Sequence, residues 1–104
     1  MYIIAGQDQA ERLKENYTVL ELETFERDGQ PIPTFCVVAA DAIPLLELPD
    51  LERYKQLHAE FIVEYRQGNY KFCEDLVEHL YGRFGGELDS FYDTILGRIR
   101  SSRQ

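Results

Sequence analysis

Residues 51–84 constrain the fold most, because they have the pattern of two amphipathic helices joined by a short turn. In the first segment, apolar and aromatic residues return every three or four positions, which is the spacing of one helix face. These residues are Leu51, Tyr54, His58, Phe61 and Tyr65, with Leu57 and Ile62 widening the stripe. Gln67-Gly68-Asn69 interrupts the pattern, since glycine suits a helix end and asparagine a helix start. The sequence therefore predicts a helical hairpin that turns at Gly68.

A third helix completes the predicted helical half, residues 50–102, which Asp50 opens as an N-cap. The second helix has its own apolar stripe, made of Cys73, Leu76, Val77 and Leu80. Gly85-Gly86 then stops it, and a third helix is predicted to begin near Glu87. The stripe of that helix comprises Leu88, Phe91, Tyr92, Ile95, Leu96 and Ile99. Three helices are therefore expected to share one apolar interior.

The first half, residues 1–48, is predicted to be rich in β-structure. Tyr2–Ala5 is a short apolar strand, and Asp8 is placed to cap a helix over residues 9–16. Residues 18–25 alternate, with Leu20, Leu22 and Thr24 on one face and Glu21, Glu23 and Phe25 on the other. Asp28-Gly29 is a strong hairpin signal, and residues 34–40 form the return strand. The first strand is free to pair with either strand of this hairpin.

Four prolines interrupt the chain around the return strand. Pro31 and Pro33 are expected to precede that strand and to keep its start out of a central ladder. Pro44 and Pro49 break residues 41–50 into a connector. The apolar residues of this connector, Ile43, Leu45, Leu46 and Leu48, are expected to pack on the domain.

These elements place the chain in the α+β class: a small antiparallel β unit with a short helix, followed by three helices. Alternating βαβ units are absent from the pattern, which disfavours a doubly wound sheet. A chain of 104 residues is the size of a single domain, predicted here to span residues 1–104. The formal charge is −8, and residues 1–50 carry ten acidic and three basic side chains. The acidity therefore belongs to the β-rich half.

The charge and the hydropathy pattern exclude several classes of function. Binding to a phosphate backbone requires clustered Lys and Arg, so no direct nucleic-acid contact is expected. No apolar run approaches the roughly 20 residues of a membrane span, and the start of the chain lacks the features of a signal peptide. The two cysteines form no CxxC pair, so neither a disulfide framework nor a structural zinc site is expected. The prediction is a cytoplasmic protein with reduced thiols.

Tyr65-x-x-Gly68-Asn69-Tyr70-x-x-Cys73 resembles the centre of a tetratricopeptide repeat, and the likeness covers residues 61–84. It departs at Phe61, where that family has a small residue, and at Gly85, where it has proline. A stable array needs about three repeats, and the sequence holds one. The resemblance implies peptide or protein binding rather than catalysis.

The whole chain resembles small uncharacterised proteins of tailed phages that infect marine cyanobacteria. The phrases that carry this likeness are NYTVLELETF, FCEDLVEHL and GELDSFYDTILGRI. The resemblance implies a viral accessory role in the host cytoplasm, with no activity attached.

No residue pattern predicts a catalytic site, a cofactor or a metal site. Asp75, Glu78 and His79 share a helix face, which makes a metal-dependent enzyme one hypothesis. They lack paired Glu-x-x-His motifs, and a charged helix surface is the plainer interpretation. Cys36 and Cys73 lie in apolar patterns and are expected to be packed thiols.

The preferred hypothesis is a non-enzymatic accessory protein that binds a protein partner or a second copy of itself. Tyrosines left partly exposed are typical interface anchors. The candidate contacts are Tyr54, Tyr65, Tyr70, Tyr81 and Tyr92. The alternative is an acidic regulator of a nucleic-acid-handling protein, with Glu21 and Glu23 as its contacts.

Overall fold

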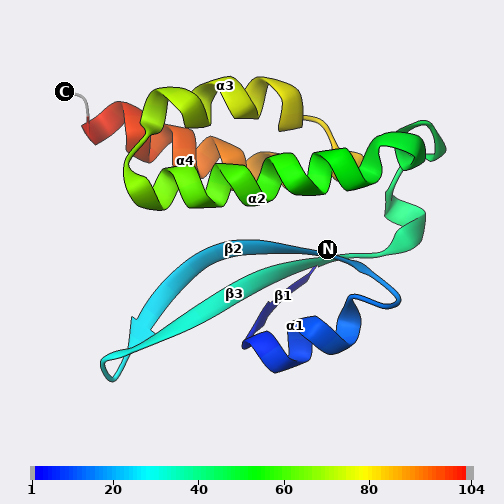
Figure 1. The fold of residues 1–104 in the computed structure, drawn as a ribbon, viewed down its shortest axis with the longest axis horizontal. Coiled ribbons are helices and arrows are strands. Elements are labelled where there is room, and N and C mark those ends of the chain that lie inside the picture. The colour runs from blue at the N-terminus through cyan, green and yellow to red at the C-terminus, as the bar shows by residue number, and fades with distance from the viewer. Residues whose placement is uncertain (1, 103–104) are drawn as a thin grey trace. The chain divides into compact units, whose positions relative to one another are not determined.

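The computed structural model describes residues 2–102 and confirms the α+β class (Figure 1). The chain divides into two compact units, Met1–Ile43 and Pro44–Gln104. This boundary falls a few residues before the predicted one, because the short helix η2 (Leu45–Asp50) contacts α2 (Leu51–Gln67). That the two units form one domain stays a prediction, and each unit has its own arrangement of elements.

The N-terminal unit is a three-stranded antiparallel sheet with one helix. Its strands are β1 (Tyr2–Ala5), β2 (Thr18–Arg27) and β3 (Gln30–Val38), in the order β1-β3-β2. The predicted hairpin turn is confirmed: Asp28 and Gly29 have φ angles of 53° and 78°, as a two-residue type I′ turn requires. The pairing left open by the sequence is settled, since β1 pairs with β3 in the register Tyr2↔Val37.

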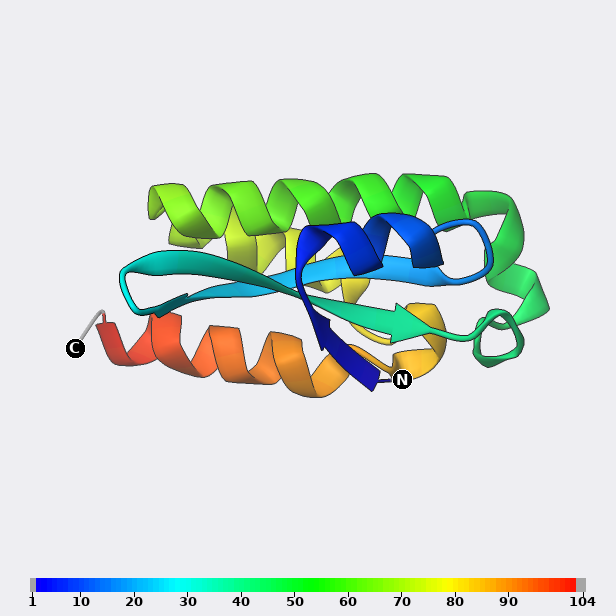
Figure 2. The same cartoon turned by 90° about the horizontal axis from the view of Figure 1, so that it is seen from below.

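Helix α1 (Gln7–Leu13) covers one face of this sheet (Figure 2). Its Ala10 is buried with Ile4, Phe35 and Val37, and Leu13 packs against the same cluster. The helix starts and ends earlier than predicted, since Gly6, with φ of 101°, occupies the N-cap position that the sequence assigned to Asp8.

Two details of β2 and β3 differ from the expected alternation. Leu20 and Leu22 are buried as predicted, but Thr24 is exposed, as are all the residues that follow it in β2. The register of β2 against β3 also shifts by one residue between Glu21 and Thr24, which is a β-bulge that bends the strand. The prolines Pro31 and Pro33 lie inside β3 rather than before it. They are tolerated there because β1 reaches only Thr34 to Val37, which leaves their segment with β2 alone.

The C-terminal unit contains α2, α3 (Tyr70–Leu80) and α4 (Asp89–Ser102), which Figure 1 shows side by side. Gly68 ends α2 in the left-handed conformation, with φ of 80°, which confirms the predicted turn. The predicted stripes supply the core: Phe61, Cys73, Leu80, Leu88, Tyr92, Ile95 and Ile99 are all fully buried. The predicted start of the third helix, Glu87, lies two residues before the first residue of α4.

The interior of this unit includes one buried polar pair. His58 and Tyr92 are almost completely enclosed, and His58 Nδ1 lies 2.8 Å from the Tyr92 hydroxyl. Phe61, Phe84 and Phe91 surround the His58 ring at centroid distances of 6.2 to 6.4 Å. The histidine on the apolar stripe is therefore a core residue with a hydrogen-bond partner.

The connector between the units contradicts one expectation. Ile43 is buried as predicted, but the exposed fractions of Leu45, Leu46 and Leu48 are 81%, 93% and 47%. The inward residue of η2 is Glu47, whose Oε2 accepts a 2.9 Å hydrogen bond from the backbone N–H of Phe84. This bond fixes the rotation of η2 with its leucines pointing outward.

Candidate functional site

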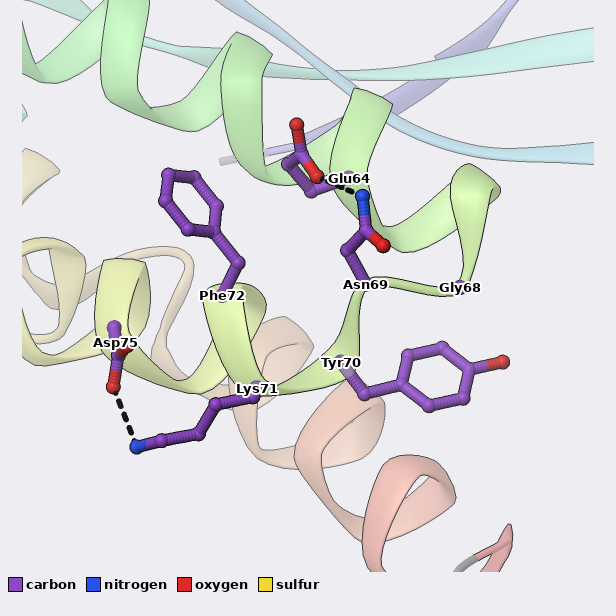
Figure 3. Close-up of a pocket in the computed structure, with 7 residues that line it drawn as sticks. All are labelled: Glu64, Gly68, Asn69, Tyr70, Lys71, Phe72 and Asp75. Carbon is purple, nitrogen blue, oxygen red and sulfur yellow. Dashed lines mark hydrogen bonds and ion pairs between the residues drawn. The ribbon is translucent and has the colours of Figure 1, made fainter.

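The surface between α2 and α3 is hollowed by two depressions that share Phe72 and Asp75. The larger, of about 660 Å³, lies at the turn between the helices (Figure 3) and is lined by Glu64, Gly68, Asn69, Tyr70, Lys71, Phe72 and Asp75. The smaller, of about 310 Å³, is lined by Arg53, Leu57, Glu60, Phe72, Asp75, Leu76 and His79. Because both depressions are lined by Phe72 and Asp75, they are adjacent, and we name them together the α2–α3 groove.

Helical spacing explains how the groove walls arise. Arg53, Leu57, Glu60 and Glu64 lie three or four residues apart and so form one stripe along α2. On α3, Phe72, Asp75, Leu76 and His79 repeat at the same spacing. Each stripe lies beside the buried stripe of its own helix, where two packed helices leave a valley between them.

Phe72 is the central apolar residue of the groove. Its side chain is 43% exposed and points toward α2 in Figure 3, away from the Lys71–Asp75 pair. Leu76 is buried and Leu57 half-buried, so they form an apolar floor beside it. The centre of the groove therefore offers apolar surface within a polar rim.

Two polar contacts hold the rim at the turn (Figure 3). Lys71 Nζ lies 2.8 Å from Asp75 Oδ1, and this hydrogen bond, with the charge of Asp75, raises the pKa of Lys71. The Asn69 amide donates to the Glu64 carboxylate rather than capping α3 with its side chain, although Asn69 does hold the N-cap position. These contacts occupy Glu64, Lys71 and Asp75 within the chain.

At the other end of the groove, two charged side chains remain available. Among residues 2–102, neither Arg53 nor Glu60 forms an ion pair. Both are exposed and lie on the same stripe of α2. The groove therefore presents one cation and one anion to an incoming molecule, beside an apolar centre.

The five predicted tyrosines do not form one surface. Tyr70 lines the groove and lies 6.0 Å from the half-buried Tyr65, measured between ring centroids. Tyr81 is exposed beyond the end of α3, where its hydroxyl donates to Asp93 and this bond raises its pKa. The expectation of partial exposure is wrong for Tyr92, which the His58 hydrogen bond holds in the core, and for Tyr54, which is buried with the Arg83 guanidinium over its ring at 4.8 Å.

The acidic residues of the hairpin also differ from one another in their exposure to solvent. Glu21 and Glu23 are half-buried on β2, whereas Glu26 and Asp28 are exposed at the far end of the hairpin. An acidic contact surface at this hairpin would therefore centre on Glu26 and Asp28. That the surface binds a basic protein stays a hypothesis.

The residues of the metal hypothesis do not converge. Nowhere in residues 2–102 do three His, Cys, Asp or Glu side chains come together in a way that would hold a metal ion. Asp75 is engaged by Lys71, and Glu78 does not line the groove that contains Asp75 and His79. The triad of Asp75, Glu78 and His79 is therefore not assembled.

Both cysteines are buried, free thiols. Burial, followed by the nearby charges of Glu64 and Glu74, raises the pKa of Cys73 to about 11. Its Sγ is 3.8 Å from the carbonyl oxygen of Phe61, to which it donates a weak hydrogen bond. At neutral pH Cys73 is a packed thiol rather than a nucleophilic thiolate.

The residue patterns did not predict three of the residues that line the groove: Arg53, Leu57 and Phe72. One signal was present: Phe72 lies directly before Cys73 and so falls off the apolar stripe of its own helix. Helical periodicity therefore places Phe72 outside the core, although it does not show that Phe72 borders a depression.

The fold and the groove together define an α+β protein with a hollowed helical-hairpin surface. Comparisons with protein-family models, with curated proteins and with solved structures gave no match. The tetratricopeptide and phage resemblances therefore stay predictions. None of the helices in the described part of the chain combines the length and apolarity needed to cross a bilayer.

Proposed function

We propose that the protein is a non-enzymatic binding module whose α2–α3 groove receives an apolar segment of a protein. The observation that carries the proposal is the half-exposed Phe72, which lines both of two adjacent depressions. Aromatic side chains in concave, partly apolar surfaces are the usual anchors of protein binding. Arg53 and Glu60 supply the charges that would orient the bound segment.

The dimensions of the groove favour a short helical or compact segment rather than a broad flat interface. In helix-in-groove binding, apolar side chains spaced three or four residues apart enter a cleft between helices. Leu57, Phe72 and Leu76 would take these side chains. The contacts from Asn69 to Glu64 and from Lys71 to Asp75 support the rim before binding, which lowers the ordering cost.

The same proposal includes an accessory role in the cytoplasm, without a cofactor. Its support is the resemblance of NYTVLELETF, FCEDLVEHL and GELDSFYDTILGRI to proteins of cyanobacteria-infecting phages. If that resemblance reflects origin, the cytoplasm is that of an infected host.

A displayed library of random peptides tests the groove while leaving the identity of the natural partner open. Peptides enriched on the wild-type protein would be measured against Phe72→Ser and against a matched control, Phe25→Ser. Phe25 is an exposed aromatic residue of β2 and lies outside the groove. Both substitutions remove exposed apolar surface without opening the core.

We expect the enriched peptides to carry apolar residues three or four positions apart and to bind Phe25→Ser as they bind wild type. Their affinity for Phe72→Ser should fall at least about tenfold, as expected for loss of an anchor residue. An empty selection, or peptides that bind Phe72→Ser with unchanged affinity, would refute the proposal. Circular dichroism of each variant confirms that it is folded.

A further inference from the structure

The charges that line the α2–α3 groove are not balanced along its length. They belong to the cations Arg53 and Lys71, the anions Glu60, Glu64 and Asp75, and the imidazole of His79. Lys71 and Asp75 lie 2.8 Å apart and offset each other. Glu64 accepts a hydrogen bond from the Asn69 amide, which is neutral and leaves the carboxylate charge in place. Among the described residues, neither Glu60 nor Glu64 forms an ion pair.

Arg53 lies too far along α2 to neutralise these two glutamates. Glu60 follows Arg53 by seven residues and Glu64 by eleven, which places them about 10 and 16 Å further along the helix axis. At physiological ionic strength the Debye length is only about 8 Å. Glu60 and Glu64, by contrast, are four residues apart and so are neighbours on one stripe. The end of the groove near the helix turn is therefore anionic.

The two glutamates oppose the local preferences of a helix. Like charges four residues apart destabilise a helix. Glu64 also lies in the last turn of α2, where the helix dipole favours cations over anions. Its side chain is half-buried, so the carboxylate has lost part of its hydration without gaining a counter-ion. Departures from local preference concentrate at functional sites, and a bound cation would relieve all three.

The acids of α3 strengthen the negative potential at this end of the groove. The pKa of Lys71 is raised mainly by its hydrogen bond to Asp75 and by the charge of Asp75, and less strongly by the charges of Glu74 and Glu78. Arg66, the other cation near the helix turn, lines neither depression. Both helices therefore present more anions than cations to a molecule at this end of the groove.

We propose that the segment received by the α2–α3 groove is cationic and amphipathic, with a Lys or Arg against Glu60 and Glu64 and apolar side chains on Phe72. This inference rests on the proposed function, because it names the chemistry of the segment that the same groove receives. The side chain of Phe72 points toward α2, from which Glu64 projects (Figure 3). Basic and apolar side chains one turn apart share one face of a helix and can contact both features together. Arg53 repels a cation at the opposite end, which orients the segment.

Two displayed peptide libraries test the charge of the segment. Both carry varied apolar residues three and four positions apart, and the positions between them are fixed as lysine in one library and as glutamate in the other. We expect binders of the full chain from the lysine library only, because complementary charge favours the correct partner and like charge rejects the wrong one. These lysine peptides should bind Phe72→Ser at least about tenfold more weakly than wild type.

The double variant Glu60→Gln with Glu64→Gln removes both charges and keeps the size of the side chains. It should bind the lysine peptides about fivefold more weakly than wild type at low salt. Raising the salt from about 0.05 to 0.5 M should weaken binding to wild type by a similar factor and hardly affect the double variant. The control, Glu52→Gln with Glu78→Gln, changes the net charge equally at two exposed acids that line neither depression. It should bind as wild type does, and circular dichroism checks that each variant is folded.

Two results would overturn the inference: glutamate peptides that bind as well as lysine peptides, or lysine peptides that bind the Glu60→Gln, Glu64→Gln variant as tightly as wild type. If such peptides still lose affinity on Phe72→Ser, the cationic segment is wrong and the proposed function stands. If neither library yields a peptide that requires Phe72, both are wrong.

Discussion

Removal of the Glu47 carboxylate should destabilise the C-terminal unit far more than its place in a surface connector suggests. Glu47 is 9% exposed, and its Oε2 accepts the N–H of Phe84, a residue with no exposed surface. In Glu47→Ala this N–H loses its acceptor in a buried position, which costs about 1–3 kcal/mol. Phe84 also has a φ angle of 54°, a conformation that costs a non-glycine residue about 1–2 kcal/mol and that the bond helps to maintain.

The free energy of unfolding should therefore fall by about 2 kcal/mol in Glu47→Ala. For a chain of this size, such a loss lowers Tm by roughly 10 °C. Urea titration followed by helical circular dichroism provides the measurement, since the helices lie mostly in the affected unit. Glu47→Gln keeps an oxygen acceptor and loses only the charge, so its loss should be about half as large.

Glu52→Ala serves as the control, because Glu52 is an exposed acid five residues further along that pairs with Lys55 at 3.1 Å. Its effect should stay within about 0.5 kcal/mol, as for most surface substitutions. The prediction is wrong if Glu47→Ala matches this control, or if Glu47→Gln is as destabilising as Glu47→Ala. The first result would show that the Phe84 N–H needs no acceptor, and the second that an uncharged oxygen does not replace the carboxylate.

Three further predictions concern the helices. Tyr92→Phe removes the hydroxyl partner of His58 Nδ1 in the core and should cost about 1–2 kcal/mol in urea unfolding, whereas an unchanged midpoint would show that the pair contributes nothing. Gly68→Ala should destabilise the protein by about 1 kcal/mol, because the φ angle of Gly68 is 80°. Gly97→Ala should stabilise it by up to about 1 kcal/mol, because Gly97 lies inside α4 with open space around the new methyl group. Changes of the same sign in the two free energies of unfolding would contradict this prediction. Because the pKa of Cys73 is raised from 9 to about 11, its alkylation should be slow at pH 8 and accelerate toward pH 11. The protonated thiol should stabilise the fold below about pH 9, and this contribution should be lost as the pH rises through 11. A fast alkylation at pH 8 would refute the shift.

The features that the sequence predicts well are those encoded locally. The stripe that contains Leu88, Ile95 and Ile99 is buried, and the turn at Asp28-Gly29 forms because few residue pairs accept two positive φ angles. Helix periodicity and turn chemistry act over a few residues, so one sequence suffices to predict them. The position of β3 at the sheet centre depends instead on the return of β1, which no local pattern encodes.

The candidate site was harder to predict for the same reason. Phe72 and Leu57 belong to different helices, and only their packing turns two ordinary surface stripes into one groove. The hydrophobic pattern correctly identified which faces are buried, but it does not say where two helices leave a valley between them. The tyrosines illustrate the limit: Tyr92 and Tyr70 were both candidate contacts, yet Tyr92 lies in the core and Tyr70 lines the groove.

The outward orientation of Leu45, Leu46 and Leu48 follows from the geometry of a 3₁₀-helix. With three residues per turn, Glu47 shares its row with Pro44 and Asp50, while Leu45 and Leu48 form a second row and Leu46 falls on a third. Only one row can face the unit, and the bond from Phe84 to Glu47 selects it. Burial of a leucine contributes about 1.5–3 kcal/mol, so selection of the acidic row leaves several kcal/mol of favourable apolar burial unused within the monomer. The rotation of one short helix therefore decides whether a carboxylate or the leucines pack against the unit, and in this protein the hydrogen bond to the Phe84 N–H accompanies the burial of the carboxylate.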